Sequence, residues 1–252
     1  MQKQKTMTND PYTDYYINNK FIPKLLADDL MTQYTFKTMH DNKDILIYEA
    51  GVYRTNGRDR ILQIVQTKLK NLAFNSKGVE VAKFIETATL VNRNVFNESK
   101  TVINFKNGLY DLESGFKDHT PELLSTIQIP VNYDPDVKCP RIEKFLSEIV
   151  SEQDVQVLLE WFGYCLIPNN QFQKAMMLCG DGANGKSTIL GLLAAFLGIE
   201  NVSSSTLQRL ETEKFAVAGL FGKLANICAD IPSNKMHKTD VFKSLSARCG
   251  IT

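Results

Sequence analysis

One stretch of the chain, residues 175–198, constrains the fold more than any other. It begins with an apolar run of strand length, Ala175-Met176-Met177-Leu178-Cys179, as expected of a strand that is buried on both faces. A glycine-rich segment follows, Gly180-Asp181-Gly182-Ala183-Asn184-Gly185-Lys186-Ser187. The next residues have a strong helical pattern that ends at Gly198, a residue type typical of helix C-termini. Strand, glycine-rich loop and helix in this order predict an α/β domain with a phosphate-binding loop of the Walker A type.

The residue types in this loop suit the phosphate chain of a nucleotide. Gly180, Gly182 and Gly185 allow the backbone to wrap with its N–H groups directed at phosphate, and the helix N-terminus adds the positive end of its dipole. We expect Lys186 to contact the β- and γ-phosphates and Ser187 to coordinate Mg²⁺. The predicted cofactors are therefore ATP and Mg²⁺, and the predicted binding residues are Gly180, Asp181, Gly182, Ala183, Asn184, Gly185, Lys186, Ser187 and Thr188.

Such a loop also needs a carboxylate at the end of a neighbouring strand. The apolar run Leu224-Ala225-Asn226-Ile227-Cys228-Ala229 ends in Asp230 and is closed by Pro232. We predict that Asp230 is the Walker B acid, which helps to hold the metal and acts with Lys186 in catalysis. The alternative is a strand-terminal aspartate that caps a turn. Many hydrolytic members have a second acid at the next position, which here is Ile231, so the catalytic base is not identified.

Composition indicates a soluble globular protein. The 252 residues are 43% hydrophobic and 23% charged, with a formal net charge of +1, which argues against a strongly basic domain that coats nucleic acid. The polar start has no apolar segment of a secretory signal, and the longest apolar run, 189–199, is too short to cross a bilayer. Five scattered cysteines without a CxxC pair indicate reduced thiols rather than zinc ligands. We therefore expect a cytoplasmic protein without a membrane segment.

Local patterns divide the chain into five predicted parts. They are a polar lead-in (1–20), a smaller α+β domain (21–130), a proline-rich linker (131–140), a helical connector (141–169) and the loop-containing domain (170–252). Hairpins are predicted at 45–54, with Glu49-Ala50-Gly51 as the turn, and at 102–112, with Asn107-Gly108 as the turn.

Helices are predicted from apolar spacing, which places related side chains on one face. In the connector, Ser151 is expected to cap a helix, with Asp154 three residues later. The apolar residues that carry the helical spacing are Ile61, Ile64, Val65 and Leu69, then Val81, Phe84, Ile85 and Ala88, then Ile142, Phe145, Leu146, Ile149 and Val150, and finally Val155, Leu158, Leu159 and Phe162.

Several motifs in order resemble those of a known family. They are Asn107-Gly108-Leu109-Tyr110-Asp111-Leu112, Ile129-Pro130-Val131, Tyr133-Asp134-Pro135 with Cys139-Pro140, Phe145-Leu146, Gly163-Tyr164, the loop at 182–187, Lys214-Phe215, Gly222-Lys223-Leu224 and 226–232. Over roughly residues 21–246, the chain resembles the superfamily 3 helicases of phage and plasmid primase–helicase proteins, which are related to the poxvirus primase–helicase. In that family the part before the linker is a helicase-associated domain.

The resemblance implies a specific function. The family's P-loop NTPase domain, a doubly wound parallel sheet, drives ATP-dependent unwinding of DNA by a homo-hexameric ring during replication of a virus, phage or plasmid. ATP sits between subunits, a basic finger reaches in from the neighbour, and single-stranded DNA passes through the central channel. Other replication proteins are possible partners.

The chain departs from the family after Phe242-Lys243-Ser244-Leu245-Ser246, where the family continues into a Gly-Gly-Asp segment. The doubly wound parallel sheet that the resemblance implies is therefore incomplete, and we expect this chain to be a C-terminally truncated member of the family. Its activity as a helicase and ATP hydrolase stays uncertain at this point. The alternatives are a nucleotide-binding or partner-docking fragment without helicase turnover and, less well supported by the region before the loop, a small-molecule kinase.

Overall fold

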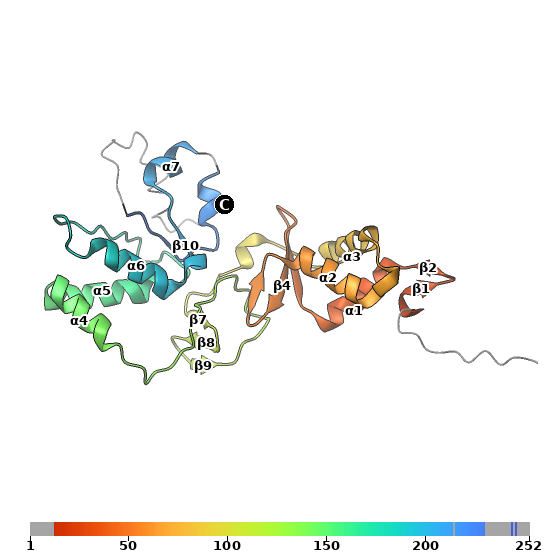
Figure 1. Cartoon of the computed structure of the whole chain (residues 1–252), viewed down its shortest axis with the longest axis horizontal. Helices are drawn as coiled ribbons and strands as arrows, with labels where there is room; N and C mark the ends of the chain where they lie inside the picture. The colour runs from red at the N-terminus through yellow and green to blue at the C-terminus, as the bar shows by residue number, and fades with distance from the viewer. Residues whose placement is uncertain (1–12, 214, 230–242, 244, 246–252) are drawn as a thin grey trace, which may run out of the picture. The chain divides into compact units, whose positions relative to one another are not determined.

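The chain has a mixed α/β fold. The structure, a computed structural model, describes residues 13–213, 215–229, 243 and 245. The chain divides into two compact units, residues 1–96 and 97–252 (Figure 1). The described residues form four small sheets flanked by helices, which confirms the predicted α/β class. The predicted borders at 131 and 141 both fall within the second unit and stay predictions.

In the first unit, three helices pack on a four-stranded sheet. The sheet has the order β5-β4-β3-β6, with β3 antiparallel to β4 and parallel to β6. A short hairpin of β1 and β2 precedes the first helix. The elements are η1 (Thr13–Tyr15), β1 (Tyr16–Ile17), β2 (Lys20–Phe21), α1 (Pro23–Gln33), β3 (Phe36–Met39), β4 (Ile45–Glu49), β5 (Val52–Arg54), α2 (Gly57–Leu69), η2 (Lys70–Leu72), α3 (Asn75–Ala88), β6 (Leu90–Val91) and η3 (Arg93–Val95).

Apolar periodicity explains the core of this unit. The hairpin at 45–54 and the helical spacings in α2 and α3 are confirmed, since their apolar side chains face one cluster with α1. Phe84 and Ala88 differ from the prediction, because both are exposed, Phe84 to 44%, while Ala82 takes a buried position on α3. The buried cluster consists of Leu26, Ala27, Leu30, Phe36, Ile45, Ile47, Ile61, Ile64, Val65, Leu69, Val81, Ala82 and Ile85.

One charged side chain is buried beside this core. Glu86 on α3 is 4% exposed and accepts hydrogen bonds from Lys83 (2.6 Å) and from Arg58 on α2 (2.8 Å). The hydrogen bond from Lys83, together with Arg58, holds the pKa of Glu86 below its usual value of 4.5. The ion pair to Arg58 therefore ties α2 to α3 in addition to their apolar contacts.

The second unit contains a three-stranded sheet and a group of helices. The antiparallel sheet has the order β7-β8-β9, and a two-stranded parallel sheet pairs β10 with β11. The elements are β7 (Val102–Phe105), β8 (Gly108–Asp111), β9 (Gly115–Lys117), α4 (Pro140–Ile149), α5 (Glu152–Cys165), α6 (Lys186–Leu197), η4 (Ile199–Asn201), β10 (Val202–Ser203), α7 (Leu207–Thr212), η5 (Val217–Leu220) and β11 (Ala225–Asn226).

The predicted hairpin at 102–112 forms, but its turn lies one residue earlier than the predicted Asn107-Gly108. Phe105 pairs with Gly108, so the turn residues are Lys106 and Asn107, and none of Lys106, Asn107 and Gly108 has a positive φ. Gly108 instead lies in β8, where a Cβ would come within 2.5 Å of the Phe116 ring and 2.7 Å of the Lys117 carbonyl oxygen. The glycine is therefore required by the close approach of β9 rather than by the turn.

Two further predictions about this unit were wrong. Residues 175–179 form no strand. The neighbouring strand β11 pairs with β10, and no strand in the described residues pairs with the apolar run. Leu159 is 47% exposed, whereas Cys165 is buried on α5 with Leu158 and Phe162. The Ser151 cap is confirmed, since its Oγ accepts a hydrogen bond from the Asp154 N–H.

The four cysteines in the described residues are free thiols, as predicted. Burial among apolar side chains raises the pKa of Cys165 to about 11, so this thiol stays protonated at neutral pH. Within the described part of the chain, no helix is long and apolar enough to cross a membrane.

We predict that Glu86→Ala lowers the free energy of unfolding at pH 7 by about 1–3 kcal/mol, since two charge-assisted hydrogen bonds to a buried carboxylate are lost. Because folding lowers the pKa of Glu86, its stabilisation is complete above the usual value of 4.5 and is lost as the pH falls through the lowered value. Urea denaturation between pH 3 and pH 7, with hydrogen exchange of α2 and α3, measures both effects. Asp28→Ala is the control, because its pair with Lys24 is exposed on both sides. Equal losses in the two variants would contradict the assignment.

We predict that Gly108→Ala destabilises the second unit by about 1–3 kcal/mol, because β9 must move to admit a methyl group. Gly191→Ala is the matched control on α6, where a Cβ has no neighbour within 4 Å and removing a mid-helix glycine stabilises by roughly 0.5–1 kcal/mol. Denaturation followed by the fluorescence of Trp161, the single tryptophan, measures both changes. A neutral Gly108→Ala would show that β9 moves freely.

Candidate functional site

The candidate site is the glycine-rich segment that leads into α6. This helix starts at Lys186, as predicted, and its N-cap is Gly185. The helix lies beside α5 (Figure 1), and its inner face, with Ile189, Leu193 and Leu197, is buried in one cluster with apolar side chains of α4 and α5. The helix ends at Gly198 with a φ of 86°, which confirms the predicted C-terminal glycine. The loop therefore leads into a helix that is packed against the apolar core from its first turn to its last.

The loop backbone has a left-handed conformation at three positions. The φ angles are 150° at Gly180, 58° at Ala183 and 87° at Gly185. The two glycines adopt such angles without a steric cost, which is the physical reason for their residue type. Ala183 adopts one despite its Cβ, and backbone strain of this kind concentrates at ligand-binding segments. At Gly182 a Cβ would have no neighbour within 4 Å, so the backbone there faces open space.

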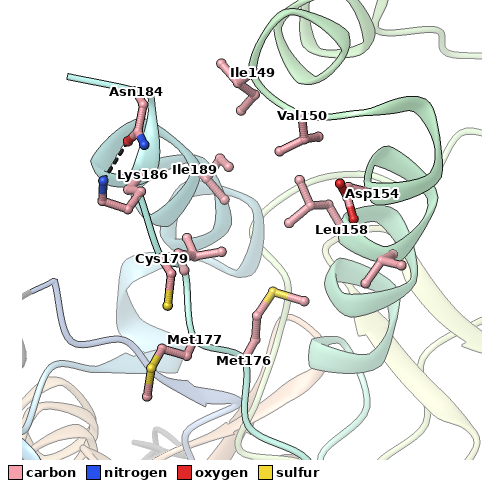
Figure 2. Close-up of a pocket in the computed structure, with 12 residues that line it drawn as sticks. Ile149, Val150, Asp154, Leu158, Met176, Met177, Cys179, Asn184, Lys186 and Ile189 are labelled. Carbon is pink, nitrogen blue, oxygen red and sulfur yellow. Dashed lines mark hydrogen bonds between the residues drawn. The ribbon is translucent and has the colours of Figure 1, made fainter. Parts of the chain in front are cut away.

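Oxygen atoms of the loop surround the Lys186 ammonium group. It donates to the carbonyl oxygens of Gly180 (2.8 Å) and Asp181 (2.6 Å) and to Asn184 Oδ1 (2.6 Å). Figure 2 shows the last of these hydrogen bonds as a dashed line. The side chain thus curls back over its own loop, and the loop gathers oxygen acceptors around one positive charge. A phosphate group offers the same kind of acceptor.

The first turn of α6 has no side-chain cap. Its N-cap, Gly185, has no side chain that accepts a hydrogen bond from the helix N–H groups. The first N–H groups of any α-helix have no acceptor within the helix, and they carry the positive end of the helix dipole. Ser187 and Thr188 lie in this turn and are exposed. Lys186, the N–H groups of the first turn and the exposed Ser187 therefore lie at the same helix end.

The predicted Walker B acid, Asp230, lies outside the described residues. The strand before it is shorter than predicted: only Ala225–Asn226 forms β11, parallel to β10. The Leu224 N–H donates to the Asn201 carbonyl, and the Ile227 N–H donates to the Ser203 carbonyl. Among the described residues, no three His, Cys, Asp or Glu side chains gather as a metal site. The metal-binding role of Asp230 stays a prediction.

A pocket adjoins the loop on the side of α4 and α5. Figure 2 shows Ile149, Val150 and Asp154 on one side, Asn184, Lys186 and Cys179 across from them, and Met176 at the lower end of the view. The full lining is Ile149, Val150, Asp154, Val157, Leu158, Met176, Met177, Leu178, Cys179, Asn184, Lys186 and Ile189. It is mostly apolar, with polar groups at the loop and at Asp154.

The sequence patterns predict no ligand role for the pocket residues outside the loop. Asp154 was predicted only as part of the Ser151 cap, and Met176 only as part of a buried strand. Their helical and strand-like patterns are equally typical of core packing, so no sequence signal separates lining from core. Only the arrangement of α5 opposite the loop brings them together.

Two family matches cover most of the chain. Residues 30–151 match the family described as D5 N terminal like, the N-terminal part of primase–helicases. Residues 178–252 match a family of unknown function, DUF5906. The first match contains the motifs between 107 and 140, and the second contains the loop and α6.

A curated viral protein is also similar. Over 110 residues the chain is 33% identical to a protein of Acanthamoeba polyphaga mimivirus that is named a putative helicase. This similarity covers 40% of the chain and 11% of the mimivirus protein. Both the N-terminal match and this relative agree with the family that the ordered motifs indicate. The chain therefore belongs to the phage and viral primase–helicase family.

Proposed function

We propose that residues 180–188 bind the phosphate chain of ATP together with Mg²⁺. The observation that carries this proposal is the Lys186 ammonium group, which the loop surrounds with three oxygen acceptors at the open end of α6. An ammonium group held at a helix N-terminus in a glycine-rich turn is the donor set that a nucleotide phosphate requires. The residues present thus fit the cofactor.

Each residue has a distinct part in this proposal. Lys186 neutralises phosphate charge, and the N–H groups of the first turn of α6 donate to phosphate oxygens. The Ser187 hydroxyl is placed to ligate Mg²⁺, and Asp230 is the proposed carboxylate partner of the metal. ATP, when bound, supplies the free energy of its hydrolysis. The parallel pair of β10 and β11 is the part of the described second unit that we assign to an incomplete sheet of the P-loop NTPase kind.

At the level of the whole protein, we propose that this chain is the ATP-binding portion of a superfamily 3 DNA helicase of the primase–helicase type. The family membership and the name of the mimivirus relative support this role in virus, phage or plasmid replication. Single-stranded DNA, a homo-hexameric ring and other replication proteins are the proposed partners. A nucleotide-binding fragment without helicase turnover is the alternative that the experiments below separate.

We predict that Lys186→Ala weakens Mg·ATP binding by about a hundredfold or more, because several charge-assisted hydrogen bonds to phosphate are lost together. Titration calorimetry of the whole chain measures the affinity. Lys174→Ala is the control, since Lys174 is an exposed lysine that precedes the loop. Equal affinity in the Lys186→Ala variant and the unmodified chain would show that the loop does not bind the nucleotide.

Turnover is tested separately on the same proteins. If this chain is a working motor portion, single-stranded DNA raises its rate of ATP hydrolysis, and Lys186→Ala abolishes the increase. Binding that depends on Lys186 without any hydrolysis would instead support the binding fragment. The phosphate release rate with and without an oligonucleotide measures the difference.

A further inference from the structure

We propose that the pocket beside the loop receives the base of the bound nucleotide and that Asp154 selects adenine. This inference rests on the proposed function, since it takes residues 180–188 as the phosphate site. It adds a base-binding subsite and a specificity-determining residue. The pocket is the space between α5, the junction of α4 and α5, and residues 176–179 (Figure 2).

The position of the pocket is the first argument. Lys186 and Asn184 belong both to the loop and to the pocket lining. A ligand that places its phosphate chain at Lys186 therefore has the pocket directly beside it. The pocket volume of about 240 Å³ is below the roughly 300–1,000 Å³ of sites that enclose a whole drug-sized ligand. That size suits one part of a nucleotide, with the phosphates outside.

The lining is the second argument. Val157 is 51% exposed and Met177 is 69% exposed, although both are apolar and face a pocket. Exposed apolar side chains gathered around a concave site are typical of ligand-binding surfaces. A flat aromatic base covers such side chains, and thioethers such as those of Met176 and Met177 adapt to an aromatic ring with favourable sulfur contacts. The lining therefore matches a base better than a sugar or a phosphate.

The charge of Asp154 is the third argument. Within the described residues, its side chain has one hydrogen bond, in which Oδ2 accepts from Ser151 Oγ at 2.7 Å. An ionised carboxylate only accepts hydrogen bonds, so Oδ1 suits a ligand that donates. Adenine has an amino group on its six-membered ring, whereas guanine has a carbonyl oxygen at the corresponding position. Guanine bound in the same orientation would place that carbonyl oxygen against the carboxylate, and two hydrogen-bond acceptors repel each other.

The experiment compares three probes with Mg²⁺: ATP, GTP and inorganic tripolyphosphate, which has no base. We expect the whole chain to bind ATP at least about tenfold more tightly than either of the others, as one charge-assisted hydrogen bond and the covered apolar surface contribute. We expect Asp154→Ala to remove most of the preference for ATP over GTP while tripolyphosphate binding stays unchanged. Val157→Ser is expected to weaken ATP and GTP binding but not tripolyphosphate binding.

Ser151→Ala is the matched control, because it removes the same helix cap and leaves the carboxylate in place. It is expected to lower stability, followed by Trp161 fluorescence on α5, without a change in the ATP-to-GTP ratio. Equal affinities for ATP, GTP and tripolyphosphate would overturn the base site, and so would an equal loss for all three probes in Asp154→Ala. If tripolyphosphate binding survives Lys186→Ala or is absent from the start, the phosphate site itself fails, which separates the two proposals.

Discussion

The packing of α6 against α4 and α5 is the constraint on which the candidate site depends. Ile189, Leu193 and Leu197 lie on one face of α6 and are buried together with Leu158 and Phe162 of α5. Because a helix is stiff, burial of this face also determines where its first turn points. The glycine-rich segment can then vary its backbone without moving the Lys186 end of the helix.

The same packing explains why the loop and the pocket share residues. The helix that carries Lys186 lies beside the helix that begins after Ser151, so the α4–α5 junction is next to the loop, and residues 176–179 line the pocket beside both. Asp154 serves the helix as a cap partner and the pocket as a carboxylate. The sequence alone predicts only the capping role of such a residue, because the capping pattern is sufficient to explain why an aspartate stands there.

Lys186 has a consequence for how a ligand must bind. Its ammonium group already has three oxygen acceptors from Gly180, Asp181 and Asn184. A phosphate chain must replace some of these acceptors, so binding exchanges one set of charge-assisted hydrogen bonds for another. The net gain is smaller than the count of phosphate contacts suggests. The Asn184 acceptor belongs to a side chain, whereas the other two acceptors are backbone carbonyls.

The sequence by itself determined the local elements that depend on near neighbours in the chain. Apolar spacing was sufficient to predict the helices α2, α3 and α6. A serine predicted the start of α5 and a glycine predicted the end of α6. Each of these signals acts within one helical turn. The position of the glycine-rich loop before α6 was also predictable from the order of its residues alone.

Tertiary structure decided what depends on distant partners. Residues 175–179 are not a strand because no described strand pairs with them, and position 108 requires a glycine because the neighbouring strand β9 lies close to it. The pocket exists only because α5 packs opposite the loop, and no periodicity along the chain encodes which side chains meet across such a gap.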